Sequence, residues 1–416
     1  MSFESPKHVV VIGAGIVGLS VAWFLQDYGV KVTVLDQKAV AAGSSWGNAG
    51  WISPGLTTPL PEPSVLRYGL KSLVRPEAPL YVPLSWDPSL ARFLTKFAMH
   101  CTLKQCRRAM ESFIPINNEA TQAYDVLCAA DSSLEIHEAP ILAAFENSNQ
   151  ATDLLHELEM INQAGQIVET ETLSGKELRE SVALLSNKVT FGIRIKGQRY
   201  IDPAAFTNKL AASVVARGGV IALDKKVLSL STVRNGVIFN TSDQTQITAD
   251  AGVLCTGAWI HQLAGTLGVK MPVRAGRGYS FVIATQETVP HPVYFPVQRV
   301  ACTPAGINAL RVAGTMEFRD PDFPLDQSRI NAIIRSAKPL LNNVDYNLRT
   351  SDWVGSRPVS ADGMPLIGAT KVRGIYVAGG HGMWGVTLGP ATGRLLADQI
   401  VKGETPPQIR PFDPTR

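Results

Sequence analysis

The strongest constraint on the fold is the spacing of three glycines near the N-terminus. Residues 9–18 read VVVIGAGIVG, so Gly13, Gly15 and Gly18 follow directly on a run of apolar, mostly β-branched residues. Such a run is typical of a strand that is buried on both faces. Gly13 permits a sharp turn, Gly15 leaves room for a pyrophosphate, and Gly18 lets a helix pack closely on the strand. The pattern predicts a strand, a tight turn and a helix that together bind a dinucleotide.

An acidic residue follows where such a unit needs one. After the helix, with Gly29 as its expected C-cap, the strand KVTVL ends at Asp36. A carboxylate at this place accepts hydrogen bonds from an adenosine ribose. The helix N-terminus offers N–H groups and a partial positive charge to the phosphates. The acid disfavours NADP, because it would repel a 2′-phosphate, but the fingerprint does not separate FAD from NAD.

Length and composition restrict the remaining possibilities. A chain of 416 residues predicts two domains, and 45% hydrophobic with 18% charged residues is typical of a folded enzyme. The net charge of +4, without a long basic run, gives no sign of a nucleic-acid partner. The five cysteines are scattered and show no CxxC spacing, which indicates reduced thiols in a cytosolic protein and no metal site. Neither Ser/His/Asp, HExxH nor P-loop patterns are found, so hydrolase and kinase chemistry have no support.

The N-terminal segment does not resemble a targeting signal. Only the polar stretch MSFESPKH precedes the first strand, and the apolar run 9–25 is interrupted by its glycines and followed by Asp27 and Lys31. We therefore expect a soluble, cytoplasmic protein, with peripheral contact to the inner face of the cell membrane left open. The proline-rich stretch 59–100, with Trp86, Phe93, Phe97 and Met99, covers the active site, touches a membrane or packs against its own domain; the last is favoured.

Further along the chain, elements of both kinds alternate. Helices are expected at 108–130, 151–165, 173–181, 203–217 and 327–340, with a Ser or Thr cap before the third and Asp202 before the fourth. Strands are expected at 135–145, 251–257, 276–284, 293–300 and 309–315, and Asn235–Gly236 is expected to form a hairpin turn. Residues 374–401 again read as strand, glycine-rich turn and helix. We predict a cofactor domain of residues 1–50, 200–270 and 352–416, and a substrate domain of 51–199 and 271–351.

Six motifs in this order resemble the D-amino acid oxidase superfamily of FAD-dependent oxidoreductases, with bacterial D-amino acid dehydrogenase and glycine oxidase nearest. They are VVVIGAGIVG, the acid at Asp36, SSWGNAGWISPG, VLCTGAW, GSRPVSADGMPLIG and IYVAGGHGMWGVTLGPATG. The resemblance implies an α/β fold with a Rossmann-like FAD-binding domain of the GR2 type and a discontinuous α+β substrate domain with a mixed sheet. It implies non-covalent FAD, because no cysteine follows Arg357 for a covalent link.

The resemblance also implies which residues contact FAD. The expected cofactor residues are Gly13, Ala14, Gly15, Ile16, Val17, Gly18, Asp36, Gln37, Ser44, Ser45, Asn48, Ala49, Gly50, Val227, Thr256, Gly257, Trp259, Arg357, His381, Gly382, Met383, Trp384, Gly385, Val386 and Thr387. The loop after the last strand is expected to face the pyrimidine oxygens of the flavin. For His381 we favour positioning the flavin over acting as a base; a buried helix-entry residue is the alternative.

Two residues are expected to contact the substrate. The guanidinium of Arg357 presents a planar fork that binds a carboxylate through two hydrogen bonds. Tyr279 is the second catalytic candidate by family resemblance. Arg274, Arg277 and Arg299 are weaker candidates for the role of Arg357.

The activity that the resemblance implies is oxidative deamination of an amino acid, with a D-amino acid favoured. Hydride passes from Cα to flavin N5, and the imino acid hydrolyses to a keto acid and ammonia. The electron acceptor stays open between a quinone, a carrier protein and O2. Alternatives are oxidation of a secondary or cyclic amine (hydroxyproline, proline, sarcosine or glycine), a hydroxy-acid or glycerol-phosphate enzyme, a FAD-binding subunit of a multi-subunit amine dehydrogenase, and an NAD-binding regulator.

Overall fold

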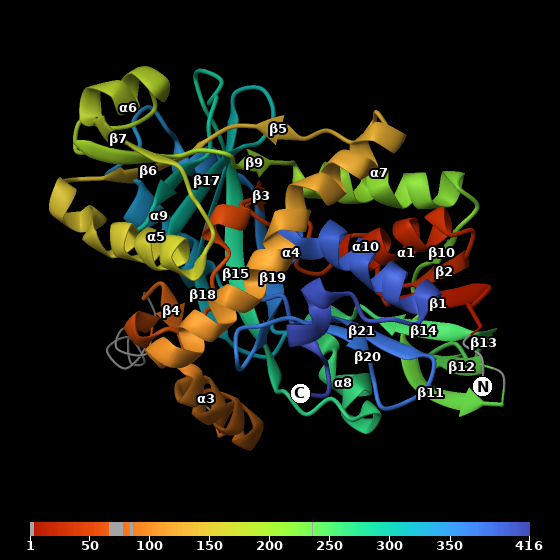
Figure 1. Ribbon diagram of the computed structural model, residues 1–416. Helices are drawn as coiled ribbons and strands as arrows, with labels where there is room; N and C mark the ends of the chain where they lie inside the picture. Colours follow the sequence, from red (N-terminus) through yellow and green to blue (C-terminus); the bar gives the residue numbers. More distant parts are fainter. Residues whose placement is uncertain (1–3, 66–77, 84–85, 235) are drawn as a thin grey trace.

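A parallel sheet built from distant parts of the chain forms the centre of one half of the molecule (Figure 1). The computed structural model describes residues 4–65, 78–83, 86–234 and 236–416. The order of the strands in this parallel sheet is β10 (Val220–Ala222), β2 (Lys31–Leu35), β1 (His8–Ile12), β14 (Ala251–Leu254), β21 (Ile375–Gly379) and β20 (Leu366–Ala369). Neighbours run parallel, except that β20 is antiparallel to β21. The sheet confirms the Rossmann-like half of the predicted fold.

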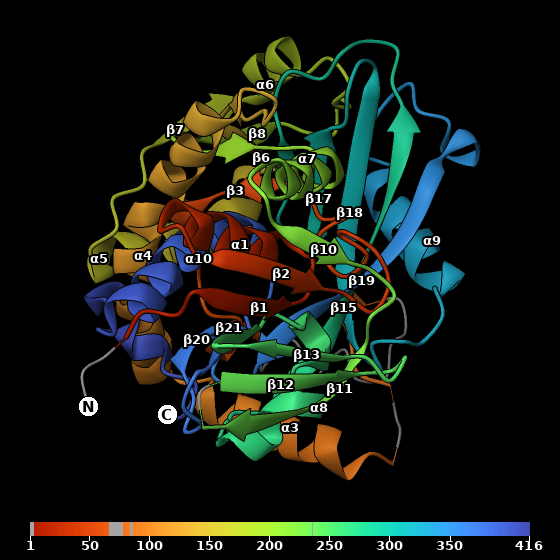
Figure 2. The same ribbon diagram turned by 90° about the vertical axis from the view of Figure 1, so that its right-hand side faces the viewer.

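Both faces of β1 are buried, as its unbroken apolar run predicts. Val9 and Val11 point into a core shared with two helices, α1 (Ile16–Asp27) and α10 (Gly385–Lys402). Val10 and Ile12 point into a second core, which the meander β11 (Val227–Val233), β12 (Gly236–Thr241) and β13 (Gln246–Ala249) closes. Figure 2 shows the meander on the side of the sheet opposite to α1 and α10. The expected hairpin of β11 and β12 is confirmed by their antiparallel pairing, although Asn235 lies outside the described residues.

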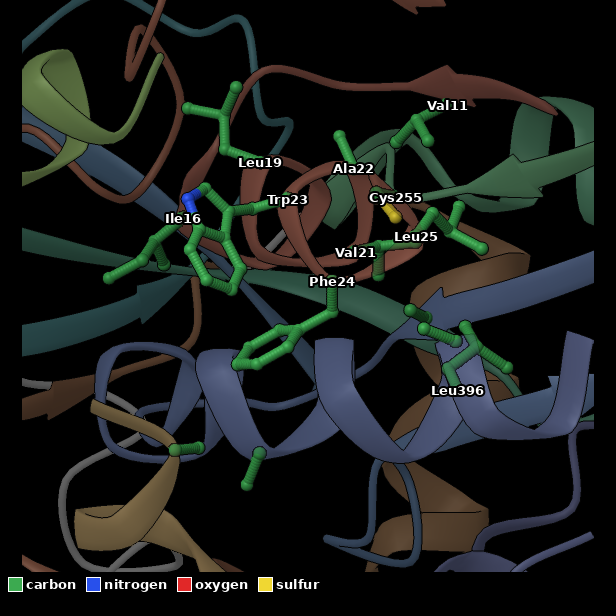
Figure 3. Packing of buried hydrophobic residues seen from close by; sticks show 14 of the residues in the cluster. Val11, Ile16, Leu19, Val21, Ala22, Trp23, Phe24, Leu25, Cys255 and Leu396 are labelled. Carbon is green, nitrogen blue, oxygen red and sulfur yellow. The ribbon is translucent and has the colours of Figure 1, made fainter. Parts of the chain in front are cut away.

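Close packing of α1 on α10 depends on small residues. A Cβ at Gly393 of α10 would lie 2.6 Å from the backbone carbon of Ser20, so only glycine fits at that crossing. Beside it, Phe24 of α1 lies between the two helices (Figure 3). The indole of Trp23 instead donates to Ser213 Oγ at 3.2 Å, which ties α1 to α7 (Pro203–Ala216). The long helix α4 (Leu103–Ala130) adds Phe113 and other residues to the same core.

A large mixed sheet forms the centre of the other half. Its order is β19 (Thr350–Ser360), β15 (Val273–Ala284), β18 (Ala309–Phe318), β17 (Val300–Pro304), β16 (Val293–Phe295), β6 (Ile141–Phe145), β8 (Phe191–Ile195) and β7 (Thr170–Ser174), with β4 (Leu80–Tyr81) beside β18. The β16–β6 and β18–β4 pairs are parallel and the others antiparallel. Helix α9 (Gln327–Ala337) covers one face with Ile330 and Ile333, and α5 (Thr152–Ala164) covers part of the other. The mixed sheet confirms the second part of the predicted fold.

Further strands and helices lie outside these two sheets. They are β3 (Trp51–Ile52), β5 (His137–Glu138) and β9 (Arg199–Tyr200), which form a small sheet, and the helices α3 (Pro88–His100), α6 (Gly175–Ser181) and α8 (His261–Ala264). Within the described ranges, no helix combines the length and the apolar character that crossing a bilayer requires.

Local signals in the sequence are confirmed where they act through the nearest few residues. Ser174 caps α6 in a capping box with Glu177, and Asp202 caps α7 by accepting from the next backbone N–H groups. The expected strand 135–145 is wrong as a single element. The structure divides it into β5 and β6 at Pro140, which has no N–H to donate to a sheet.

The predicted domain boundaries stay a prediction. β19 starts at Thr350 and pairs with β15 in the mixed sheet, although the sequence assigned residues from 352 onward to the cofactor domain. Helix α4 packs on α10, although the sequence assigned it to the substrate domain. Long-range packing decides both placements, and no local motif reports it.

Candidate functional site

A large pocket opens at the carboxyl ends of the parallel strands, as expected for sheets of this kind. Ile12, Cys255 and Gly379, at or just after the ends of β1, β14 and β21, line its base. Ser356 and Arg357 of β19 line it from the mixed sheet. The pocket contains about 1210 Å³ of empty space, part of it open to solvent. It therefore lies where the two sheets approach each other.

Most of the predicted cofactor residues meet at this pocket. Those that line it are Gly13, Gly15, Ile16, Val17, Gly18, Asp36, Gln37, Ser44, Ser45, Asn48, Val227, Thr256, Gly257, Trp259, Arg357, His381, Gly382, Gly385 and Val386. Those that do not line it are Ala14, Ala49, Gly50, Met383, Trp384 and Thr387. Lining residues that the sequence did not single out include Lys38, Gly43, Lys225, Lys226, Gln262 and Ser356.

The three glycines of the first turn have different steric roles. Gly13 has φ +115°, and a Cβ there would lie 2.4 Å from the carbonyl oxygen of Cys255. A Cβ at Gly18 would lie 2.0 Å from the carbonyl oxygen of Gly13, so the turn and helix cannot accept alanine at either place. At Gly15 a Cβ would meet only Ser45 Oγ, at 3.3 Å. Gly15 is therefore the glycine whose absent side chain matters most for the pocket.

The carboxylate of Asp36 is held in place by two backbone donors. The Ala14 N–H donates to Oδ2 at 2.8 Å and the Lys38 N–H donates to Oδ1 at 2.8 Å. Ala14 thus acts through its backbone on the acid and does not line the pocket itself. Lys225 and Lys226, which precede β11, line the same end of the pocket. This end combines a fixed acceptor with two lysines, of which Lys225 is ion-paired with Asp243.

The pocket fits a dinucleotide cofactor. A Cβ built on Gly257 or Gly382, which have φ +54° and +56°, would meet no described atom within 4 Å, so both glycines border open space. Thr256 has a buried hydroxyl that lacks a partner in the described part of the chain. Backbone N–H groups at glycine-rich turns and a helix N-terminus are suited to phosphate oxygens. The donors, the open turns and the fixed acid agree with the fingerprint.

The side chain of Arg357 lies on one face of the mixed sheet, against the backbone of Gly278. A Cβ on Gly278 would lie 2.2 Å from its Cζ, so only glycine lets the guanidinium lie there. Nη1 donates to the carbonyl oxygen of Thr315 over a long 3.4 Å, and no carboxylate of the described residues forms an ion pair with it. Burial lowers the pKa of Arg357 to about 10. A half-buried cation without a counter-ion is suited to bind an anion.

Tyr279 faces away from the pocket, which corrects the expectation that it reaches the substrate. Side chains alternate along β15, so Gly278 faces Arg357 while Tyr279 faces α9 with Phe281. Tyr279 is fully buried and its hydroxyl donates to Glu317 Oε1 at 2.6 Å. Its role in this structure is core packing.

The three weaker arginine candidates differ in their surroundings. Arg274 pairs with Asp87 at 2.5 Å, and Arg277 pairs with the buried Glu317 at 3.2 Å. Both guanidinium groups therefore already have carboxylate partners outside the pocket. Arg299, just before β17, has an exposed side chain and is on the same face of the sheet as Arg357.

His381 is buried at the entry to α10. Its Nε2 lies 2.9 Å from Thr392 Oγ1, and burial lowers its pKa to about 4. The ring is therefore neutral and a weak base at neutral pH. These features argue against proton transfer and agree both with the positioning role and with a buried helix-entry residue.

Met383, Trp384 and Thr387, which follow His381, attach the loop to parts of the protein outside the pocket. Trp384 Nε1 donates to the Thr58 carbonyl at 2.7 Å, and Thr387 Oγ1 donates to the Trp51 carbonyl at 3.0 Å. Met383 packs against the cluster around Phe93. The side chains of Met383, Trp384 and Thr387 therefore contact other parts of the protein and do not line the pocket.

Ala49 and Gly50, in the turn after Asn48, lie next to the pocket without lining it. Gly50 has φ +81°, and its N–H donates to Asn48 Oδ1 at 2.9 Å. A Cβ on Gly50 would lie 2.2 Å from the Ile201 carbonyl oxygen, so this glycine faces protein and not the pocket. Ala49 is likewise outside the lining.

Comparison with known proteins now gives the class of this protein. The family model described as FAD dependent oxidoreductase (DAO) matches residues 8–399, so the chain belongs to that family. It is an oxidoreductase that uses FAD.

Individual relatives support the assignment. D-amino acid dehydrogenase from Vibrio vulnificus (strain CMCP6) is 28% identical over 401 residues, covering 95% of this chain and 96% of the relative. Glycine oxidase from Geobacillus kaustophilus superimposes with a TM-score of 0.75 at 19% identity over 100% of this chain and 99% of that one. L-proline dehydrogenase from P. horikoshii gives 0.70 at 18%, over 100% and 98%. At these identities the two solved structures establish the fold alone.

Proposed function

We propose that this protein oxidises a D-amino acid at its Cα and releases a keto acid and ammonia. The observation that carries the proposal is the guanidinium of Arg357, which is half-buried in the pocket and has no carboxylate partner among the described residues. An amino acid brings the carboxylate that completes this cation. The relative from Vibrio vulnificus is named D-amino acid dehydrogenase, which supports the D configuration.

FAD, when bound, supplies the acceptor for the hydride that leaves Cα. The chain supplies position: Arg357 fixes the carboxylate, and Gly278 leaves the space in which that guanidinium lies. The substrate releases the hydride from Cα only when its amine is neutral, and the cation of Arg357, with Asp36 as the one carboxylate among the described lining residues, favours that neutral form. Loss of hydride leaves an imino acid, which water converts to the keto acid and ammonia. No side-chain base is needed for these steps.

We propose that the cofactor residues divide the work by position. The glycine turn and the N-terminus of α1 hold the pyrophosphate, Asp36 holds the adenosine ribose, and Val227 borders the adenine. The loop Thr256–Gly257 and the loop from His381 to Val386 border the flavin. The open glycines in these loops support that division.

Product analysis tests the proposed reaction. With D-alanine and an artificial electron acceptor, the purified protein should form pyruvate and ammonia in equal amounts, while L-alanine forms neither. Equal turnover of both enantiomers would contradict the D configuration. If the protein oxidises proline or sarcosine and not D-alanine, its substrate is a secondary amine and not the primary amine proposed here.

An electron acceptor must reoxidise the flavin, and we propose a membrane quinone. The support is three exposed apolar side chains in or next to α3: Trp86 is 99% exposed, and Met99 and Leu103 are each 68% exposed. Arg92 of α3 and Lys104, which follows Leu103, are also exposed, and exposed apolar and basic side chains together are suited to an anionic lipid surface. Figure 1 shows α3 at the periphery of the molecule. Phe93 and Phe97, in contrast, are buried against Phe318, as the favoured interpretation predicts.

Vesicle binding tests this surface. The protein should co-sediment with vesicles of phosphatidylglycerol and phosphatidylethanolamine, and a Trp86→Ser, Met99→Ser, Leu103→Ser variant should stay in the supernatant with full activity toward a water-soluble acceptor. The unchanged chain remaining in the supernatant would contradict the membrane contact. Fast reoxidation by O2 would make the protein an oxidase.

A further inference from the structure

One face of the mixed sheet extends from Arg357 to a second polar cluster. The register pairs Ser280 with Ala313, Ala313 with Ala301, and Ala301 with Tyr294 across four neighbouring strands. Paired residues point to the same side of a sheet. Gly278 faces the guanidinium of Arg357, and Ser280, two residues further along β15, points to the same side. Ala301 and Tyr294 are both partly exposed there. Ser280 is covered by the Gly47 carbonyl, to which its hydroxyl donates at 2.8 Å, and the small side chains of Ala313 and Ala301 follow it on the way to Tyr294.

Arg299 lies near Arg357 on this face. It directly precedes Val300, which pairs with Gly314, so Arg299 is next to Thr315 on the adjacent strand. The carbonyl oxygen of Thr315 is the acceptor 3.4 Å from Arg357 Nη1. Adjacent strands are about 5 Å apart. The two arginines are therefore separated by a length that an amino-acid side chain spans.

The backbone between these arginines has an unusual conformation. Arg299 has φ +54° and Thr315 has φ +52°, a region that β-branched residues rarely adopt. Strained residues of this kind persist mainly at functional sites. The hydroxyl of Thr315 is also buried with no partner among the described residues. The strain and the unpartnered hydroxyl both point to a ligand at this position.

The cluster around Arg299 holds donors and acceptors in near balance. Its guanidinium lies beside the phenol of Tyr294 and the carboxylates of Glu157 and Glu62. Glu157 Oε1 also accepts from Thr58 Oγ1 at 3.1 Å. Burial and the charge of Glu62 raise the pKa of Glu157 to about 7, against the opposing effect of Arg299. A ligand with a full charge would upset this balance, whereas a neutral polar group finds both kinds of partner.

Aromatic side chains connect the cluster to the pocket wall. The rings of Trp51 and Tyr294 meet edge to face with centroids 5.6 Å apart. The indole of Trp384, just before the pocket residue Gly385, donates to the carbonyl of Thr58, whose hydroxyl holds Glu157. The cluster is thus fixed to the loop that borders the cofactor.

We propose that Arg299, with Tyr294 and Glu157, forms the distal end of the substrate site and selects a substrate whose side chain carries an uncharged hydroxyl or amide. The inference rests on the proposed function, because it places the carboxylate of the substrate on Arg357. Arg357 then recognises what all amino acids share, and Arg299 recognises the group that distinguishes one from another.

Two probes without an amine test the site apart from catalysis. Succinamate and 4-methylpentanoate both carry a carboxylate and have the same heavy-atom skeleton, but only succinamate ends in an amide. Their dissociation constants for the FAD-loaded protein are measured by calorimetry. We expect succinamate to bind about tenfold more tightly, because its amide oxygen accepts a hydrogen bond from the charged guanidinium of Arg299.

The matched variants are Arg299→Met and Arg335→Met. Arg335 is an exposed arginine of α9, on the opposite face of the same sheet. Arg299→Met should bind both probes equally, and Arg335→Met should keep the preference for succinamate. Tyr294→Phe removes only a hydroxyl and should reduce the preference in part, which tests the site even if Arg299→Met fails to fold. Equal binding by the unchanged protein, a preference retained in Arg299→Met, or tighter binding of the dicarboxylate succinate would overturn the proposal.

The two proposals fail separately. If D-alanine reduces the flavin while the preference for succinamate is absent, the distal site is wrong and the oxidation stands. If no amino acid reduces the flavin while the preference depends on Arg299, the oxidation is wrong and the distal site holds for another carboxylate.

Discussion

At the scale of single residues, the pocket depends on Arg357, a cation that has no ion-pair partner within the described ranges. Arg357 is held over Gly278 and makes one long hydrogen bond, to the Thr315 carbonyl. Arg277 of the same sheet, in contrast, has the buried carboxylate of Glu317 as its partner. An arginine without such a partner destabilises the empty site and favours an anionic ligand.

Replacing Arg357 should therefore affect the substrate far more than the fold. Arg357→Met is expected to lower kcat/KM for a D-amino acid by roughly 10²–10³-fold, since two charge-assisted hydrogen bonds are lost. The flavin spectrum should stay close to that of the unchanged protein. Steady-state kinetics and thermal unfolding measure the two effects. A loss below threefold in kcat/KM would show that another residue holds the carboxylate.

A pH prediction follows from His381, whose pKa burial lowers to about 4. The neutral ring is favoured in the folded state, so its contribution is complete above about pH 6.5, where the unfolded chain is also neutral, and is lost as the pH falls toward 4. From pH 7.5 to pH 5 the unfolding free energy should fall by about 2 kcal/mol more in the unchanged protein than in His381→Asn. Denaturant unfolding at both pH values measures this difference, and parallel curves would contradict the buried neutral ring.

At the scale of elements, different glycines of the strand–turn–helix unit β1–α1 are required for folding and for cofactor binding. Gly18→Ala brings a Cβ within 2.0 Å of the Gly13 carbonyl oxygen, while Gly15→Ala meets only Ser45 Oγ at 3.3 Å. We expect Gly18→Ala to lose several kcal/mol of stability, because helix α1 must move off β1.

Gly15→Ala should fold normally and lose FAD. The two variants are compared by thermal unfolding of the flavin-free protein and by the ratio of flavin to protein after purification. Normal flavin content in Gly15→Ala, or normal stability in Gly18→Ala, would show that the two glycines do not divide the work in this way.

The sequence predicts the parts of the site that adjacent residues specify. The glycine turn, the acid at Asp36 and the caps at Ser174 and Asp202 are each read within a few positions. The placement of Tyr279 cannot be read this way. Which face it takes depends on the phase of β15 and on its pairing with β18, where the register shifts between Arg277 and Tyr279.

The same limit applies to residues that meet only through long-range packing. Lys225 and Lys226 reach the pocket because the chain crosses from β10 to the meander beside Asp36, and the Asp36 carbonyl accepts from the Lys225 N–H at 2.8 Å. The partners of Trp384 lie far away in the sequence, at Thr58. No local pattern could have reported either contact.

At the scale of the whole molecule, two sheets contribute different parts to one pocket. The parallel sheet brings the glycine turns and the acid to its carboxyl edge, while the mixed sheet brings Arg357. Segments of the chain that are far apart in sequence alternate between the sheets (Figures 1 and 2). The arrangement places the residues proposed for the cofactor and those proposed for the substrate against each other.

The most direct test of this account is the visible spectrum of the purified protein during anaerobic titration with D-amino acids. The account predicts a yellow protein whose flavin absorbance is lost on adding a D-amino acid and is unaffected by the L-enantiomer. A yellow protein that no amino acid bleaches would contradict the proposed oxidation. A colourless protein that cannot be reconstituted with FAD would contradict the cofactor itself.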